Sequence, residues 1–139
     1  MAVNALYLAD KSALARMTVA AVRSRLEPLL LDGLIATCGI IDLELGYSAR
    51  DAHTHASLRR ERSALPRIPL EETVFDRALA VQGMLALRGQ HRLPIPDLVL
   101  AAAAEQAQLS VLHYDADFER ISGVTGQPHV WVVPRGSVP

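Results

Sequence analysis

Ala5–Asp10, with the sequence Ala-Leu-Tyr-Leu-Ala-Asp, is the stretch that decides the fold. A short apolar run that ends in a charge is typical of a buried parallel strand. Ser12 follows two residues later and offers an N-cap for a short helix. The pattern recurs at Leu109–Tyr114, a second apolar run followed directly by Asp115. These two runs predict two strands of one sheet, each with an aspartate at its end.

Strands and helices are expected to alternate along the whole chain. Further strands are predicted at Leu34–Cys38, Arg67–Leu70 and His129–Val133. Helical spacing of apolar residues predicts helices at Val19–Leu31, Gly39–Tyr47, His53–Ala64, Glu71–Arg88, from Asp97 through Ala104, and within Asp115–Ser122. In the helix at Glu71–Arg88 the residues expected in the core are Val74, Leu79, Val81, Leu85 and Leu87. The alternation predicts an α/β fold, with a mostly parallel central sheet flanked by helices on both faces.

Length and composition limit the other possibilities. The chain has 139 residues, enough for one domain, which we place at residues 1–133 with a flexible tail at 134–139. The net charge of −1 makes no case by itself for nucleic-acid or membrane binding. The single cysteine, Cys38, lies in an apolar run and is expected to be a buried thiol. With no signal peptide and no membrane span expected, the default location is the cytoplasm.

Five acidic residues carry the functional signal, because each lies at the end of an apolar stretch or near a helix. They are Asp10, Glu44, Asp97, Asp115 and Asp117. Clustered carboxylates repel one another and raise each other's pKa. A fold that brings them together usually holds a hard divalent cation, which prefers oxygen ligands. The pattern therefore predicts a metal site assembled from distant parts of the chain, and with it phosphate chemistry.

Simpler explanations exist for single members of this set. A lone aspartate such as Asp10 is better explained as a turn residue or helix cap. Asp97, which follows Pro94-Ile95-Pro96, is equally well explained as the N-cap of its helix. Asp115 and Asp117 together exceed what capping of one helix requires. The hypothesis of a site thus rests on the whole set rather than on any one residue.

Glu44 lies inside an apolar helix that also contains Asp42 and Gly46. Residues two positions apart on a helix point about 200° apart, so Asp42 and Glu44 cannot share a face. One of them is expected to face a positive group. Glycine inside a helix costs roughly 1 kcal/mol relative to alanine, which a close approach of another backbone would explain at Gly46.

Four motifs occur in a fixed order along the chain. They are Leu8-Ala9-Asp10-Lys11-Ser12-Ala13-Leu14, Ile41-Asp42-Leu43-Glu44-Leu45-Gly46, Pro96-Asp97-Leu98 with the apolar run to Ala104, and Leu112-His113-Tyr114-Asp115-Ala116-Asp117-Phe118. This ordered set resembles the PIN-domain family and, among PIN domains, the VapC-type toxins of toxin–antitoxin pairs. The resemblance runs from about Leu6 to Val133. The Asp-X-Asp-Phe element and the Ala-rich helix behind Asp97 are its most specific parts.

The resemblance implies a single PIN-like domain and a type II toxin that acts as a metal-dependent endoribonuclease on single-stranded RNA. It implies that Mg²⁺ or Mn²⁺ activates a water for attack on the phosphodiester, held by four catalytic carboxylates: Asp10, Glu44, Asp97 and Asp115. Asp117 would be an outer or second-site ligand, and Ser12 would hydrogen-bond a carboxylate or a metal-bound water. The implied partners are a VapB-type antitoxin, the RNA substrate and a second copy of the chain in a homodimer.

An acidic pocket repels RNA, so nearby cations must supply the attraction. Arg88, His91 and Arg92 precede Asp97 closely enough to line the mouth of such a site. Three further arginines could form an outer track for RNA: Arg59, Arg60 and Arg62. The alternative is that they only make one face of a helix soluble.

The chain departs from the family pattern at Lys11, where family members usually carry a small hydroxyl residue. A lysine beside the acids could partly neutralise the site and weaken metal binding, or it could hold a phosphate. Both possibilities stay open at this stage. Lys11 is also the one feature that favours the alternative function, a catalytically inactive PIN-like module that binds RNA or protein.

Two other protein classes gather acids at strand ends, and the sequence argues against both. A receiver-like signalling domain needs a lysine after a late strand, and none follows Leu109–Tyr114. A phosphatase of the haloacid-dehalogenase type needs Asp-X-Asp after the first strand, where this chain has Asp10-Lys11-Ser12.

Overall fold

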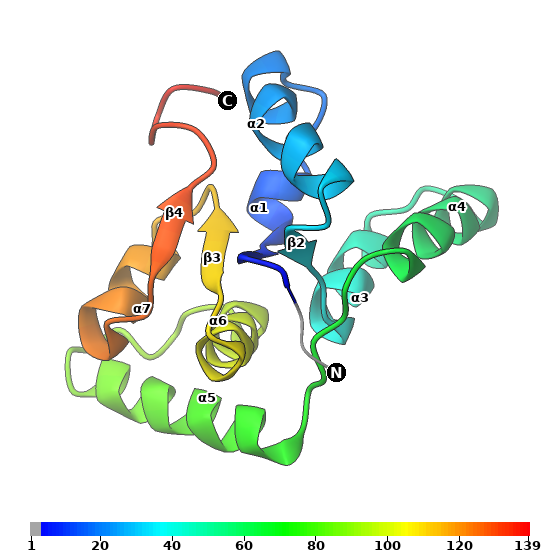
Figure 1. The fold of residues 1–139 in the computed structure, drawn as a ribbon. Coiled ribbons are helices and arrows are strands. Elements are labelled where there is room, and N and C mark those ends of the chain that lie inside the picture. Colours follow the sequence, from blue (N-terminus) through cyan, green and yellow to red (C-terminus); the bar gives the residue numbers. More distant parts are fainter. Residues whose placement is uncertain (1–3) are drawn as a thin grey trace.

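A four-stranded, entirely parallel sheet forms the centre of the computed structural model, which describes residues 4–139 (Figure 1). The strands are β1 (Tyr7–Ala9), β2 (Ile35–Ala36), β3 (Ser110–His113) and β4 (His129–Trp131). They lie in the order β2-β1-β3-β4, so the first strand of the chain sits inside the sheet. Tyr7 is paired with Ile35 on one side and with Ser110 on the other. The expectation of a mostly parallel sheet is confirmed.

Helices cover both faces of the sheet, as expected. They are α1 (Lys11–Leu14), α2 (Ala20–Leu31), α3 (Gly39–Tyr47), α4 (Ala52–Ser63), α5 (Glu72–Ala86), α6 (Ile95–Ala107) and α7 (Asp117–Thr125). Successive strand residues point to opposite faces. Leu8 and Val111 therefore join a core with α3, α5, α6 and α7, whereas Ala9 and Leu112 join a second core with α1 and α2.

Helix α6 is buried between the sheet and α5, and this placement positions one end of the site (Figure 1). Every residue from Leu98 to Ala104 is buried. The alanines in this run have short side chains, which lets the helix lie close to its neighbours on all sides. Asp97, in the first turn of α6, is consequently buried as well.

Two expectations about packing and pairing are wrong. The strand predicted at Arg67–Leu70 is reduced to one parallel bridge between Thr37 and Arg67, because the chain it pairs with turns into α3 at Gly39. Val74, Val81 and Leu85 are buried on α5, but Leu79 and Leu87 are exposed. A helical spacing of apolar residues does not tell which of them a neighbouring element covers.

The last six residues, expected to form a flexible tail, return to the body of the protein. The Tyr114 hydroxyl donates to the Val138 carbonyl at 2.8 Å, and the Arg16 Nε donates to the Pro139 carbonyl at 2.8 Å. Across residues 4–139, no helix combines the length and the apolar character that crossing a bilayer requires.

Candidate metal centre

The predicted acidic residues converge at the carboxyl end of the central strands. Asp10 follows β1 directly and Asp115 comes two residues after β3. Carboxyl ends of parallel strands meet at one edge of a sheet, where α/β proteins form their ligand sites. Asp97 reaches this edge from the first turn of α6 and Glu44 from the middle of α3.

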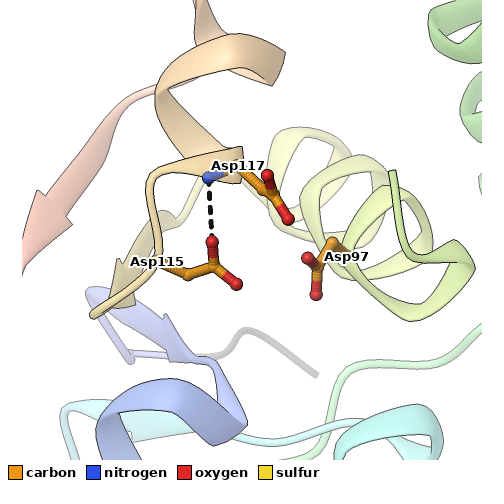
Figure 2. A group of neighbouring side chains, drawn as sticks. All are labelled: Asp97, Asp115 and Asp117. Carbon is orange, nitrogen blue, oxygen red and sulfur yellow. Dashed lines mark hydrogen bonds between the residues drawn. The ribbon is translucent and has the colours of Figure 1, made fainter. Parts of the chain in front are cut away.

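Asp97, Asp115 and Asp117 form the tightest part of the cluster. One carboxylate oxygen from each lies within 4.8 Å of the others. Figure 2 shows their carboxylates facing a common space, Asp97 from α6, Asp115 from the turn before α7 and Asp117 from the start of α7. The Asp115 carboxylate also accepts the N–H of Asp117 at 2.9 Å, which fixes the turn that carries both residues.

Asp97 is the member of the cluster in which the ionised form is least favourable. Its side chain is 6% exposed, and its Oδ2 is the one buried side-chain polar atom without a hydrogen-bond partner among residues 4–139. Burial, reinforced by neighbouring negative charges, raises the pKa of Asp97 to about 8; those charges belong to Asp10, Asp115, Asp117 and Glu44. A buried carboxylate of this kind is stable as an anion only beside a cation.

Asp97 is not the N-cap of its helix. Helix α6 begins at Ile95 with Pro94 in the cap position, and no side chain caps it. The capping explanation of Asp97 is therefore wrong. Because the carboxylate satisfies no helix N–H, it is free to face the other acids.

Asp10, by contrast, does cap a helix. Its Oδ2 accepts the N–H of Ser12 at 2.9 Å at the start of α1. Burial raises the pKa of Asp10, opposed by hydrogen bonding from Ser12, and the charge of Asp115 raises it further. The cap fixes the orientation of the carboxylate without removing it from the acidic cluster.

Ser12 links the two strand ends. Its hydroxyl oxygen accepts the backbone N–H of Tyr114 at 2.8 Å, which ties α1 to the residue before Asp115. Its predicted role toward a carboxylate or a metal-bound water stays a prediction. The observed bond already holds Asp10 and Asp115 in register.

Both acidic residues of α3, Asp42 and Glu44, face positive groups, and they do so on opposite sides of the helix. Only one of them was expected to face a positive group. Glu44 lies 3.7 Å from the Lys11 ammonium. Burial raises the pKa of Glu44, helped by the charge of Asp10 and opposed by Lys11. Asp42 faces away from the cluster and binds Arg62 and Arg67 at 3.0 and 2.7 Å.

The Asp42 side of α3 packs against α4. Arg62 is buried and also donates to the Thr37 hydroxyl, so it is not part of an exposed track for RNA. A Cβ at Gly46 would come within 3.0 Å of the His55 Nε2, so the close approach at this glycine is by a side chain of α4, not by a backbone.

Arg88, His91 and Arg92 are exposed in the connector between α5 and α6. Arg88 lies against α7, where its guanidinium is 3.5 Å from the position of a Cβ on Gly123. None of these three side chains forms an ion pair within the part of the chain that the structure describes. Their proposed contact with RNA stays a prediction.

Two side chains that contact the acids were missed as site residues. Arg120 Nη1 binds Asp117 at 2.6 Å on the first turn of α7. The i,i+3 spacing of opposite charges on a predicted helix could have revealed this pair. His113 is fully buried, and its Nδ1 accepts the N–H of Asp115 at 3.1 Å. No sequence signal separates His113 from an ordinary strand residue.

The donor set fits a hard divalent cation. Mg²⁺ and Mn²⁺ prefer carboxylate oxygens, and the three closest acids offer one oxygen each around a common space. The Asp97 Oδ2, which has no hydrogen-bond partner, is a further oxygen available to such a cation. No soft ligand belongs to this group of three.

Comparison with known proteins agrees with this geometry. Residues 7–124 match the PIN domain. The chain is 50% identical to "Ribonuclease VapC21" of Mycobacterium tuberculosis over 133 residues, 94% of this chain and 96% of that protein. It is 46% identical to "Ribonuclease VapC51" of the same organism over 132 residues, 95% and 96% of the two chains.

Solved structures share the fold. A DNA-bound VapBC from Salmonella typhimurium superposes with a TM-score of 0.75 at 17% identity, over 93% of this chain and 99% of that chain. VapBC2 from Rickettsia felis, bound to a promoter DNA fragment, gives a TM-score of 0.73 at 18% identity, over 91% and 98%. The sequence match, the fold and the acidic strand ends agree: this chain belongs to the PIN-domain family and resembles its VapC ribonucleases over nearly its whole length.

Proposed function

We propose that this protein is the toxin of a type II toxin–antitoxin pair and cleaves single-stranded RNA with the help of Mg²⁺ or Mn²⁺. The observation that carries the proposal is the convergence of Asp97, Asp115 and Asp117, with an Asp97 oxygen left without a partner. Identity of about half to proteins named VapC ribonucleases supports the same conclusion.

Asp10, Glu44, Asp97 and Asp115 would hold the cation, and Asp117 would be an outer ligand. A cation held there would activate a water for in-line attack and would stabilise charge on the leaving oxygen. The protein's own contribution is to fix the carboxylates: Asp10 by the α1 cap and Asp115 through the N–H groups around it. None of the acids needs to act as a covalent nucleophile.

Positive side chains must bring the RNA to this acidic edge. Arg88, His91 and Arg92 are exposed in the connector between α5 and α6, and Arg88 lies against Gly123 of α7. We assign these three residues to substrate binding. The burial of Arg62 leaves Arg59 and Arg60 as the exposed arginines of α4.

The partner of the toxin would be a VapB-type antitoxin. The structural neighbours from Salmonella typhimurium and Rickettsia felis are VapBC complexes. We also propose that the toxin is a cytoplasmic homodimer, as the family resemblance implies. Size-exclusion chromatography with light scattering on the purified chain distinguishes a 15.1 kDa monomer from a dimer.

The decisive experiment incubates purified protein, freed of any antitoxin, with total RNA in Mg²⁺ or Mn²⁺. Controls are an EDTA sample and the Asp97→Asn variant, which keeps the shape of the side chain but removes its charge. Cleavage that disappears in both controls supports the proposal. Intact RNA, together with no metal binding by calorimetry, favours an inactive binding module, and cleavage that survives Asp97→Asn indicates a contaminating nuclease.

A further inference from the structure

Lys11 is the first residue of α1 and directly follows Asp10, so it lies at the same strand edge as the acids. Its ammonium is 3.7 Å from a Glu44 oxygen, and 43% of its side chain is exposed. A positive charge beside one acid of such a site is unusual if the site binds a divalent cation, since the two cations repel each other. The placement therefore requires a reason.

The Lys11–Glu44 pair is loose compared with the other ion pairs among residues 4–139. Its 3.7 Å separation is the longest of them, and it exceeds the range of a hydrogen bond. In contrast, Arg120 approaches Asp117 to 2.6 Å and donates a hydrogen bond to it. An ammonium has three N–H donors. At 3.7 Å, none of those of Lys11 forms a hydrogen bond with Glu44.

A partly exposed ion pair without a hydrogen bond contributes little to stability. Lys11 can thus exchange Glu44 for another anion at small cost. The anion that the proposed reaction brings to this edge is a phosphodiester, and lysine binds phosphate as a flexible point charge. Once a divalent cation neutralises Glu44, the attraction that holds Lys11 there is weaker still.

We propose that Lys11 is a phosphate-binding residue of the site, held by Glu44 in the free protein and transferred to the RNA backbone when substrate binds. The inference rests on the proposed ribonuclease function. It assigns to Lys11 the attraction that the acids cannot supply. The role differs from that of Arg120, whose short ion pair with Asp117 holds the Asp117 carboxylate in position.

The test measures RNA binding without cleavage. A fluorescein-labelled, ten-nucleotide single-stranded RNA of mixed sequence is titrated with protein in Mg²⁺ over a range of KCl concentrations. The background is Asp97→Asn, which the proposed function expects to be inactive. Lys11→Met is compared with Lys11→Arg, which keeps the charge. The second control is Arg25→Met, which removes an exposed positive charge from α2, a helix that packs in the second core.

Loss of one phosphate contact on a single strand lowers the slope of log affinity against log salt by about 0.7. We expect this decrease, and weaker RNA binding, for Lys11→Met but for neither Lys11→Arg nor Arg25→Met. An affinity and slope for Lys11→Met equal to those of its background would overturn the proposal and leave Lys11 as the counter-ion of Glu44.

A second readout uses the metal alone. Mn²⁺ is titrated calorimetrically into the metal-free protein that carries Asp97, with and without Lys11→Met. Removal of the positive charge beside Glu44 should tighten Mn²⁺ binding, and a weaker affinity would show that Lys11 instead holds the carboxylates in place, contrary to the proposal. If the unmodified protein cleaves RNA while Lys11→Met binds RNA normally, only the role of Lys11 fails. If the unmodified protein neither binds Mn²⁺ nor cleaves RNA, the proposed function fails as well.

Discussion

The Arg62 Nε donates to the Asp42 Oδ1 at 3.0 Å and thereby joins α4 to α3. Arg62 is 7% exposed, and its Nη2 also donates to the Thr37 hydroxyl at the end of β2. One buried guanidinium thus connects two helices and the sheet edge. Since Glu44 lies two residues along α3 from Asp42, the same contact fixes the rotation of the helix that aims Glu44 at the site.

Arg62→Met should therefore destabilise the protein. The change removes two buried hydrogen bonds, from the guanidinium to the Asp42 carboxylate and to the Thr37 hydroxyl, and the expected loss in the free energy of unfolding is about 3 kcal/mol. Arg67→Met, which removes the half-exposed partner of the same carboxylate, should cost about 1 kcal/mol or less. Urea denaturation of both variants gives the comparison, and equal losses would show that the buried position of Arg62 is unimportant.

The stability of the metal-free protein should fall as the pH rises toward 8. The pKa of Asp97 is about 8 in the folded state, against an ordinary value of 3.8, so the folded state binds more protons than the unfolded state between these two pH values. Ionisation of this one group then lowers the free energy of unfolding by at most about 1.4 kcal/mol per pH unit. Denaturation in EDTA at pH 6.5, 7.25 and 8 measures the slope, which Asp97→Asn should lack.

His113 provides the opposite dependence at lower pH. Burial, with the neighbouring His129, lowers the pKa of His113 to about 4. The unfolded state then binds more protons between pH 4 and 6.5, so stability that is present above pH 6.5 is lost as the pH falls through this window. The raised pKa values of Asp10 and Glu44 act in the opposite direction, so the measurement compares Asp97→Asn with the double variant Asp97→Asn, His113→Gln. As the pH falls from 6.5 to 4.5, the protein that keeps His113 should lose more of its free energy of unfolding, and equal profiles would contradict a neutral buried imidazole.

Mn²⁺ should stabilise the folded protein. A ligand that binds only the folded state adds about 2.7 kcal/mol at one hundred times its dissociation constant. Thermal unfolding with and without Mn²⁺ should show a rise in Tm for the unmodified protein and a much smaller one for Asp115→Asn. Glu105→Gln is the matched control, because Glu105 is paired with Arg77 away from the cluster. The same rise in Asp115→Asn would place the cation elsewhere.

The Cys38 thiol should not react in the folded protein. It is fully buried, and burial raises its pKa. The thiolate is the reactive form, so a chromogenic disulfide reagent should modify Cys38 only as fast as the protein opens. Reaction rates measured at increasing urea concentrations test this, and rapid modification in the absence of urea would contradict it.

The order of elements and the acidic residues could be predicted because both follow from local patterns. Asp10 and Asp115 come after apolar strands, and their convergence follows from the geometry of a parallel sheet. What the sequence could not provide are contacts between distant segments. The partner of Glu44 depends on how α3 is rotated, and the burial of Arg62 depends on where α4 lies.

The errors have the same origin. Leu79 and Leu87 have the spacing of core residues but face solvent, since α5 is covered on one side only by its neighbours. The segment at Arg67–Leu70 has the composition of a strand, but its partner chain ends in a helix after one bridge. Local sequence preference indicates which residues can form a strand or a core, and tertiary packing determines which of them do.

The carboxylates of the site come from four separate parts of the chain: β1 and its turn, α3, α6, and the β3–α7 connection. Nowhere does a continuous segment carry more than two of them. If these carboxylates form the proposed nuclease site, we expect a growing or partly unfolded chain to be inactive, because it lacks the complete set. A protein whose proposed activity endangers the cell that synthesises it would then become toxic only when folding is complete.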